Sequence, residues 1–362
     1  MPTRVLIVGG GLTGLALAHR LAEVGVDYCL VEARDRLGGR MLSTSLPGEV
    51  GRVDLGPSWF WPGQPLIAQL LETHLIGVFA QPSEGRLAFE TRDGAVRRDL
   101  HLAPMAGALR IKGCARALVD ALAAGLDSDC ILLAHAVTQL ADNGAHVTAR
   151  LASAAGEREI EAARVVLAMP PRLAAERLRF TPTLPPAVLQ ALTAVPTWMA
   201  GQAKLVAVYD QPFWAELGLS GSAISQVGPL AEVHDASPGN GSEAALFGFF
   251  AVPAGQRSAG QATLATMAIA QLERLFGPKA AAPLQVLVKD WAIDEWTAVA
   301  ADKSGPAGHP PGGVPKELQG LWDSRLIVAG SELAPMSPGL MEGALESADT
   351  AWQMLSRPDP TG

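Results

Sequence analysis

The stretch VLIVGGGLTGLALAHRL, residues 5–21, begins with four aliphatic residues, a pattern typical of a buried parallel strand. Glycines follow, and from Leu12 onward apolar residues recur at helical spacing until Gly25 ends the pattern. Residues 27–31 predict a second strand, which ends at Glu32. The sequence therefore predicts a strand–helix–strand unit of about 30 residues at the start of the chain.

Three glycines between this strand and this helix have the spacing GxGxxG: Gly9, Gly11 and Gly14. In dinucleotide-binding turns the first permits the tight turn, the second lets a pyrophosphate approach the backbone, and the third lets helix and strand pack closely. The helix N-terminus then offers N–H groups to the phosphates. Glu32 lies where a carboxylate binds ribose hydroxyls and repels the 2′-phosphate of NADP. We therefore predict a dinucleotide site; the alternative is a glycine turn that only packs.

The residues after Glu32 distinguish a resident flavin from a travelling nicotinamide. A second glycine pair, Gly38 and Gly39, is followed by Arg40, which suits a loop that returns to the same pyrophosphate with a charge-assisted donor. A dinucleotide held from several sides is a resident cofactor, which favours FAD. An NAD-dependent dehydrogenase would leave this second glycine pair unexplained, and a surface arginine after a turn is the plainer alternative for Arg40.

Composition limits the other function classes. The 362 residues are 49% apolar and 18% charged with a net charge of −8, which argues against disorder and against a nucleic-acid partner. Cys29, Cys114 and Cys130 have no metal-site spacing and the histidines are scattered, so we expect no metal. This sparse, odd set of cysteines favours a reducing compartment, and no apolar run is long enough to predict a spanning helix. We expect a cytoplasmic protein with no membrane partner.

The sequence resembles the flavin-containing amine oxidases, the monoamine oxidase-like superfamily. The matching blocks keep their order from end to end, and the first and last are the most specific for a flavin. They are residues 5–40, VDLGPSWF at 53–60, RIKGCARALVDAL at 110–122, VVLAMPPRLAAERLRFTPTLPP at 165–186, AKLVAVYDQPFW at 203–214 and RLIVAGSELAPMSPGLMEGALESADTAW at 325–352. The chain is short for this superfamily, and the first substrate-domain segment is reduced to a predicted hairpin with its turn at 92–94.

The resemblance implies an α/β fold in which a Rossmann-like FAD-binding domain of the GR2 type is interleaved with a smaller α+β substrate domain. We expect the FAD-binding domain to take residues 1–78, 112–194 and 294–362. The substrate domain is expected to take residues 79–111 and 195–293. Within the second FAD segment the pattern predicts a helix at 114–124, a strand at 130–133, a hairpin whose turn is 142–144, and a strand at 164–168.

The resemblance also implies which residues hold the ADP half of FAD. These are Gly9, Gly11, Gly14 and Glu32, with Arg40 at the pyrophosphate and Val137 as a backbone contact to the adenine.

At the flavin end, the resemblance places Glu332 near the ribityl chain or the diphosphate. Gly339, Leu340 and Met341 are expected under the flavin, with the helix that starts near Glu342 directing its N-terminus at the C2 carbonyl of the ring. A helix N-terminus at this position stabilises an anionic reduced ring. An ordinary amphipathic C-terminal helix is the alternative.

Lys204 is the candidate catalytic residue. It lies in an otherwise apolar predicted strand, where a lysine is costly to bury without a partner. In the superfamily this lysine holds a water against flavin N5 and promotes reaction of the reduced flavin with oxygen. The alternative is a lysine on the solvent face of an edge strand.

Two departures from the superfamily pattern concern the flavin and the substrate. Many members attach FAD through a cysteine, but Ala300 stands at the matching position, so we predict non-covalent FAD. The two aromatic rings that frame an amine in the monoamine oxidases are replaced by Ala301 and Leu340. Trp59 and Trp296 are the candidates to supply aromatic surface instead, and core tryptophans are the alternative for both.

We therefore predict an FAD-dependent oxidoreductase that oxidises a small-molecule amine by hydride transfer to flavin N5, with oxygen reoxidising the flavin to give hydrogen peroxide. One alternative is a flavoprotein of the same fold acting on a non-amine donor, of the desaturase or dihydronicotinamide oxidase type. Another is a non-catalytic FAD-binding protein. The substrate, the electron acceptor and the oligomeric state are left open by the sequence.

Overall fold

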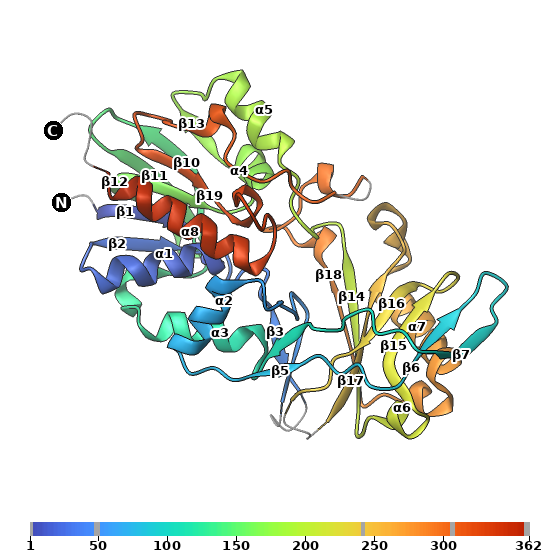
Figure 1. Ribbon diagram of the computed structural model, residues 1–362. Helices are drawn as coiled ribbons and strands as arrows, with labels where there is room; N and C mark the ends of the chain where they lie inside the picture. The colour runs from blue at the N-terminus through green and yellow to red at the C-terminus, as the bar shows by residue number, and fades with distance from the viewer. Residues whose placement is uncertain (1–2, 47–50, 240–242, 305–307, 358–362) are drawn as a thin grey trace.

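The computed structural model describes residues 3–46, 51–239, 243–304 and 308–357. Figure 1 shows two sheets with their own helices, which lie side by side and are joined by several crossings of the chain.

The first sheet has a parallel half that begins with the predicted strand–helix–strand unit. Its order is β9 (Ile131–Leu132), β2 (Tyr28–Val31), β1 (Thr3–Val8), β12 (Gly156–Ala168) and β19 (Leu326–Ala329). The strands are aliphatic and buried because helices or further strands cover both faces. The glycine-rich turn after β1 therefore lies at the carboxyl edge of parallel strands, where open α/β sheets bind ligands.

The long strand β12 also starts an antiparallel half, since its first residues pair with β11 (Val147–Ser153). β10 (Ala136–Asp142) and β13 (Arg179–Thr181) complete that half. The predicted hairpin turn at 142–144 joins β10 to β11. The predicted strand at 164–168 is correct in place but too short, because the sequence of β12 before Arg164 is polar on its exposed side and gives no aliphatic signal.

Four helices cover the parallel half and its flank. The predicted helix at 114–124 is observed as α3, and α1 and α8 pack against each other on one face of the sheet (Figure 1). The bounds are α1 Leu12–Glu23, α2 Pro65–Thr73, α3 Cys114–Ala124 and α8 Met341–Leu355. On the other face the antiparallel strands and α4 (Pro171–Arg177) and α5 (Pro186–Ala194) enclose a second core.

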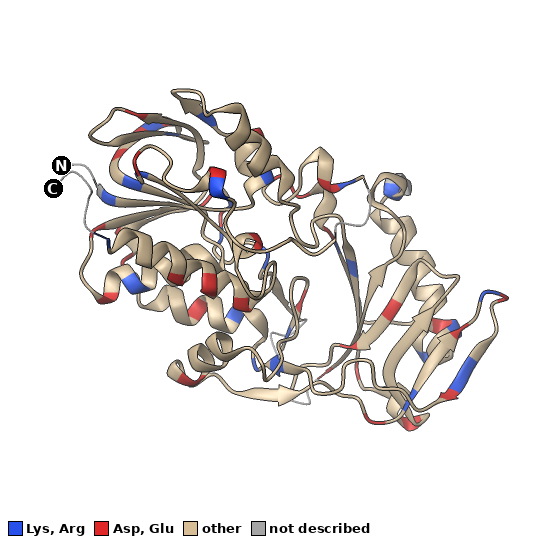
Figure 2. Ribbon diagram, turned by 45° about the horizontal axis from the view of Figure 1, so that its top comes forward, with Lys and Arg blue, Asp and Glu red and all other residues tan. Residues whose placement is uncertain are grey.

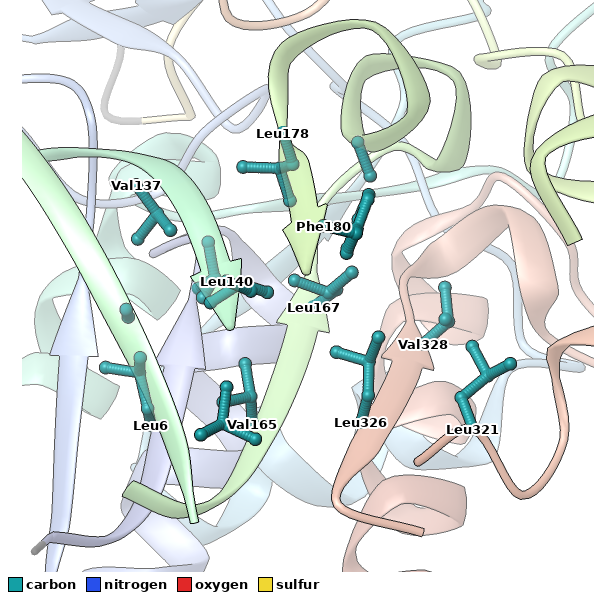
Figure 3. Close-up of a cluster of buried hydrophobic side chains, with 14 of the residues drawn as sticks. Leu6, Val137, Leu140, Val165, Leu167, Leu178, Phe180, Leu321, Leu326 and Val328 are labelled. Atoms are coloured by element: carbon teal, nitrogen blue, oxygen red, sulfur yellow. The ribbon is translucent and has the colours of Figure 1, made fainter. Parts of the chain in front are cut away.

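That second core is the apolar cluster drawn in Figure 3. It joins β1, β10, β12 and β19 to the segments around residues 178–195 and 318–322. Its labelled members are Leu6, Val137, Leu140, Val165, Leu167, Leu178, Phe180, Leu321, Leu326 and Val328. Because β19 and β12 pack into it together, the segment that follows β19 is held firmly beside the glycine-rich turn.

The second sheet is antiparallel except for the pair β15–β6. Its order is β18 (Gln285–Asp290), β14 (Ala203–Tyr209), β17 (Ala244–Phe250), β16 (Leu230–Asp235), β15 (Leu219–Ser225), β6 (Arg86–Glu90) and β7 (Val96–Leu100). The predicted hairpin with its turn at 92–94 forms β6 and β7 at one edge. Helix α7 (Gln261–Phe276) packs on the face that carries Ala203, Leu205 and Ala207, so Lys204 lies on the opposite face.

The remaining described elements are short strand pairs, one short helix and 3-10 turns. They are the pairs β3 (Ser43–Ser45) with β4 (Arg52–Asp54) and β5 (Val78–Ala80) with β8 (Leu109–Ile111), the short helix α6 (Phe213–Glu216), and the 3-10 turns Ser128–Cys130, Ala254–Ala259, Pro278–Ala281, Trp291–Ile293, Ala300–Asp302, Lys316–Leu318 and Ser331–Leu333. Each strand of the first sheet lies in a segment expected for the FAD-binding domain, and each strand of the second in a segment expected for the substrate domain. The domain bounds themselves stay a prediction.

Among the described residues, none of the helices is both long and apolar enough to cross a membrane. Acidic and basic residues are interspersed over both parts of the fold, as Figure 2 shows.

Candidate cofactor and active site

A single cavity of about 510 Å³ is lined by residues from both sheets. One end, the dinucleotide end, is lined by the glycine-rich turn, Glu32 and Val137. The other, the sheet end, is lined by Lys204, Glu232 and Phe249 of the second sheet. Since the cavity joins the two ends, a ligand held by the glycine-rich turn can extend to the lysine-bearing strand.

The three glycines of the turn have different surroundings. A Cβ atom on Gly14 would lie 2.0 Å from the carbonyl oxygen of Gly9, so this glycine permits close helix–strand packing and does not itself line the cavity. Gly9 has a φ of +112° and faces the carbonyl of Ala168. A Cβ on Gly11 would meet no atom of the described residues within 4 Å, because Gly11 opens on the cavity. This arrangement fits a turn shaped for a phosphate rather than one that only packs.

Glu32 ends β2 beside this turn, and its carboxylate is buried. It accepts hydrogen bonds from the backbone N–H of Gly10 at 2.7 Å and of Arg34 at 2.8 Å. These bonds fix the carboxylate at the cavity wall with lone pairs left for a ribose. Val137 lines the same cavity from β10, and its backbone contact with an adenine stays a prediction.

Arg40 and Glu332 form an ion pair at the wall between the two ends. The guanidinium donates to the two carboxylate oxygens at 2.5 and 3.0 Å, and the backbone N–H of Trp198 donates to the same carboxylate at 3.1 Å. Burial alone would raise the pKa of Glu332, but Arg40 holds this pKa below its usual range. Glu332 is therefore ionised, and its role in the structure is to orient Arg40.

The segment before α8 also lines the cavity. Leu340 and Met341 line the cavity at the first turn of α8, so the positive end of this helix opens on the cavity. Gly339 has a φ of +82°, and a Cβ on it would lie 2.7 Å from the side chain of Trp198. The ring of Trp198 also stacks on His309 with centroids 3.7 Å apart. The close approach of Trp198 therefore depends on glycine at position 339.

Lys204 lies on β14 between two neighbouring strands, so it is not on an edge strand. Its Nζ donates to Ser58 Oγ at 2.8 Å and to the carbonyl of Gly56 at 3.2 Å, and it lies 3.9 Å from the centroid of Phe247. The side chain is buried, and this desolvation lowers the pKa of Lys204 to about 7. The amine is therefore poised to exchange a proton near neutral pH.

The two predicted aromatic residues lie at different ends of the cavity. Trp59 is at the sheet end, where its Nε1 donates to Gln81 and its ring packs against Phe247. Trp296 also lines the cavity, but its neighbours in the chain, Asp294 and Thr297, both bind Arg34 beside Glu32. The backbone of Trp296 is therefore held at the dinucleotide end, which favours a contact with the cofactor over one with a substrate.

The expectation that Ala301 faces the substrate is wrong. Ala301 is exposed on the 3-10 turn Ala300–Asp302 and does not line the cavity. The turn is fixed by Asp302, whose buried carboxylate pairs with Arg172 and accepts from two backbone N–H groups, so the small residues before it face solvent. Ala300, which the resemblance matches to the cysteine that carries covalent flavin in other members, is exposed as well.

Trp198, Glu232 and Phe249 are among the cavity residues that were not predicted. Trp198 packs against Gly339, the glycine next to Leu340, and lines the cavity. Its position shortly before the lysine-bearing strand was the available signal. Glu232 and Phe249 gave none, because only the register of β14, β17 and β16 brings them level with Lys204.

Comparison with known families agrees with this geometry. A profile described as flavin containing amine oxidoreductase matches residues 85–353, and one described as an NAD(P)-binding Rossmann-like domain matches residues 7–73. The chain belongs to the flavin-containing amine oxidoreductase family. It is accordingly an FAD-dependent oxidoreductase, with a flavin as its cofactor.

Relatives of the family are similar to this chain over nearly its whole length. A probable flavin-containing monoamine oxidase A of Dictyostelium discoideum is 25% identical, with 95% of each chain covered. An L-amino acid dehydrogenase of Synechocystis sp. is 24% identical over 96% of this chain and 93% of its own. Among solved structures, the cyclohexylamine oxidase from Brevibacterium oxydans IH-35A aligns with a TM-score of 0.82 at 20% identity. The alignment covers 98% of this chain and 99% of the cyclohexylamine oxidase chain. A putrescine oxidase bound to putrescine aligns with a TM-score of 0.79 at 21% identity. The alignment covers 99% of this chain and 100% of the putrescine oxidase chain.

The residues present fit FAD. The space beside Gly11 is open, Glu32 and Val137 line the same cavity, and the cavity continues to Lys204. The N-termini of α1 and α8 both line it, which suits a diphosphate and an electron-rich ring.

Proposed function

We propose that this protein uses non-covalently bound FAD to oxidise a small-molecule amine, with oxygen as the electron acceptor. The observation that carries the proposal is that one cavity joins the glycine-rich turn to the buried Lys204. Bound there, FAD would supply a two-electron acceptor for the hydride on the carbon that bears the amine and a donor of these electrons to oxygen. The amine would become an imine for hydrolysis, and its N–H proton and the hydride would leave as hydrogen peroxide.

The chain's own residues bind and orient the cofactor. Gly11 and the N-terminus of α1 would hold the diphosphate, with Arg40 as the charged donor that Glu332 keeps in place. Leu340 and Met341 at the start of α8 would lie against the ring, where the helix N-terminus favours negative charge.

Lys204 is proposed to act in the half-reaction with oxygen. Ser58 Oγ and the Gly56 carbonyl fix its amine at the cavity wall. With its pKa lowered to about 7 the amine can carry a positive charge near neutral pH, and such a charge favours the addition of an electron to oxygen. Trp59 and Phe249 give this end apolar surface.

Non-covalent binding is supported by the positions of the cysteines. Cys29, Cys114 and Cys130 are free thiols, and the described residues that line the cavity include no cysteine. Ala300, where the superfamily attaches its flavin, faces solvent. The free thiols also support the proposal of a cytoplasmic location.

The relatives support an amine as the donor and leave two acceptors to be compared. The monoamine, putrescine and cyclohexylamine oxidases are named as oxidases, whereas the Synechocystis relative is named as a dehydrogenase of amino acids. Both names describe removal of hydrogen from carbon next to nitrogen. The acceptor is settled by mixing the reduced protein with oxygen and, separately, with a quinone.

The proposal is tested on the purified holoprotein. Its absorbance should show a flavin band, and denaturation should release all of the flavin into the soluble fraction. A band that stays with the precipitated chain would contradict non-covalent binding. Amines should then yield hydrogen peroxide in air. Flavin reduction by a non-amine donor alone would favour the desaturase or dihydronicotinamide oxidase alternative, and reduction by no donor would favour a non-catalytic FAD-binding protein.

A further inference from the structure

A second, smaller cavity lies beside the first turn of α3, and we call it the basic cavity. Its volume is about 220 Å³, and three residues of its wall carry a positive charge: Arg52, Arg110 and Lys112. The described residues of the wall include no Asp or Glu, and none of them lines the larger cavity. Pockets for drug-sized ligands have volumes of about 300–1,000 Å³, so the basic cavity suits a smaller occupant.

Arg110 is a buried cation that forms no ion pair with a described Asp or Glu. It is 3% exposed, and its guanidinium donates to the carbonyls of Ser237 at 2.9 Å and Ala236 at 3.0 Å, with the ring centroid of Phe79 at 5.1 Å. Two of its five N–H groups are thus used. Backbone carbonyls orient the guanidinium but leave its charge, and a buried charge is costly without compensation. An anion in the basic cavity would supply that compensation.

The other two cations of the wall are exposed and weakly paired. Lys112 has no ion-pair partner in the described part of the chain, and its carbon stem is held against Gly77, where a Cβ would lie 2.9 Å from it. Arg52 reaches Asp120 only at 3.4 Å, and Arg116 holds the same carboxylate more closely, at 2.6 Å. Both side chains can therefore bind a ligand without giving up a strong contact.

The N-terminus of α3 does not carry this site. Asp54 already accepts a hydrogen bond from the backbone N–H of Ala115 at 3.0 Å, which caps the helix from inside the fold. The thiol of Cys114 donates to the carbonyl of Arg52 at 3.0 Å, and burial raises the pKa of this thiol, so it stays neutral. The groups left to bind a ligand are the three basic side chains, and they attract an anion.

We propose that the basic cavity binds a small oxyanion of the phosphate type, either free phosphate or the phosphate group of a monoester. Arg110 offers its planar fork to the oxygens from inside the fold, and Lys112 and Arg52 bind from the exposed side. Because the basic cavity shares no wall residue with the cavity proposed for FAD, the anion and the flavin can be bound together.

A bound anion would also act on Lys204. Burial is the main cause of the low pKa of Lys204; among the neighbouring groups, Asp54 and Cys114 raise this pKa and Arg110 lowers it. An anion on Arg110 offsets the effect of this arginine, so it should raise the pKa and keep more of the amine protonated near neutral pH. This consequence rests on the role proposed for Lys204 in the reaction with oxygen.

The experiment titrates inorganic phosphate into the FAD-saturated holoprotein by calorimetry at constant ionic strength, so that the dinucleotide site is filled. We expect saturable binding of one phosphate per chain, which chloride does not reproduce. Lys112→Gln should weaken it at least about tenfold, and Lys112→Arg should retain most of it. Lys279→Gln removes the same charge from a surface pair with Glu216, and as the control it should leave the affinity unchanged.

A parallel titration with glycerol 3-phosphate distinguishes the two sources of the anion. Tighter binding of the ester than of phosphate identifies a monoester as the ligand, and weaker or equal binding identifies free phosphate. No saturable binding of either, or an equal loss of affinity in Lys112→Gln and Lys279→Gln, would overturn the site. These titrations involve no turnover, so they stand even if no amine reduces the flavin.

The effect on Lys204 is measured separately. The holoprotein is reduced with dithionite and mixed with oxygen across a range of pH, with and without phosphate at constant ionic strength. The inflection of the oxidation rate should move to higher pH with phosphate in the wild type and stay in place in Lys112→Gln. An inflection that phosphate does not move, or that it moves equally in both proteins, would overturn the effect on Lys204.

Discussion

Arg40 and Glu332, which lie 292 residues apart in the chain, meet in a two-point ion pair at the wall of the cavity. The carboxylate is fully buried, whereas the guanidinium side chain is 27% exposed. The pair connects the loop that follows the first strand–helix–strand unit with the segment between β19 and α8. These two segments, which are both expected to contact FAD, are thereby fixed relative to each other.

Removing Arg40 should destabilise the protein more than removing both partners. Arg40→Met leaves the carboxylate of Glu332 buried without its cation, at a cost of about 3–5 kcal/mol in the free energy of unfolding. The double variant Arg40→Met/Glu332→Gln removes the charge and should regain a large part of this loss. Urea unfolding of the wild type, both single variants and the double variant measures the coupling. Additive losses would show that the two residues stabilise the protein independently.

Gly11 and Gly14 should respond to alanine in opposite ways. Gly14→Ala places a methyl group against the carbonyl of Gly9 and should lower the free energy of unfolding by about 1–3 kcal/mol. Gly11→Ala meets no protein atom, so the fold should be unaffected, but the methyl group occupies the approach of the diphosphate and should weaken FAD binding at least about tenfold. Thermal unfolding of the apoproteins and FAD titration separate the two effects. Normal FAD affinity in Gly11→Ala would place the diphosphate elsewhere.

Lys204→Met should slow the reaction of the reduced flavin with oxygen by about 10- to 100-fold, because the positive charge at the cavity wall is lost. In the wild type the rate should fall as pH rises through about 7, where the amine loses its proton. Stopped-flow mixing of the pre-reduced protein with oxygen across this range measures both effects. A profile in Lys204→Met with the same inflection as the wild type would assign the titration to another group.

The same substitution should change how stability depends on pH. Burial lowers the pKa of Lys204 to about 7 in the folded protein, against 10.5 for an ordinary lysine. Between these values the unfolded chain binds more protons, so the free energy of unfolding of the wild type rises with pH relative to Lys204→Met. The lysine is most destabilising below about pH 7, and the difference disappears toward pH 10.5. Denaturation of both proteins at pH 6.5 and 9.5 tests this; a constant difference would contradict it.

The parts of the fold that depend on local patterns were predictable from the sequence. The first strand–helix–strand unit, the helix Cys114–Ala124 and the two hairpin turns have aliphatic runs, helical spacing or turn residues in short windows. The first part of β12 was missed because its exposed, polar residues are stabilised by pairing with β11 rather than by burial.

The candidate site was predictable only where one segment carries the signal. The glycines, Glu32 and Arg40 lie in one continuous motif, and Lys204 is a charge in an apolar strand. Glu232 needs the register of three strands, and Ala301 is turned outward by Asp302, which pairs with a distant arginine. These placements result from tertiary contacts, which no local pattern encodes.

The central claim, that this cavity holds a flavin which oxidises amines, is tested most directly by anaerobic titration of the purified holoprotein with amines. We expect an aliphatic amine to bleach the flavin absorbance completely at one equivalent, and added oxygen to restore it with release of hydrogen peroxide. A flavin that dithionite reduces but that no monoamine, diamine or amino acid reduces would contradict the account.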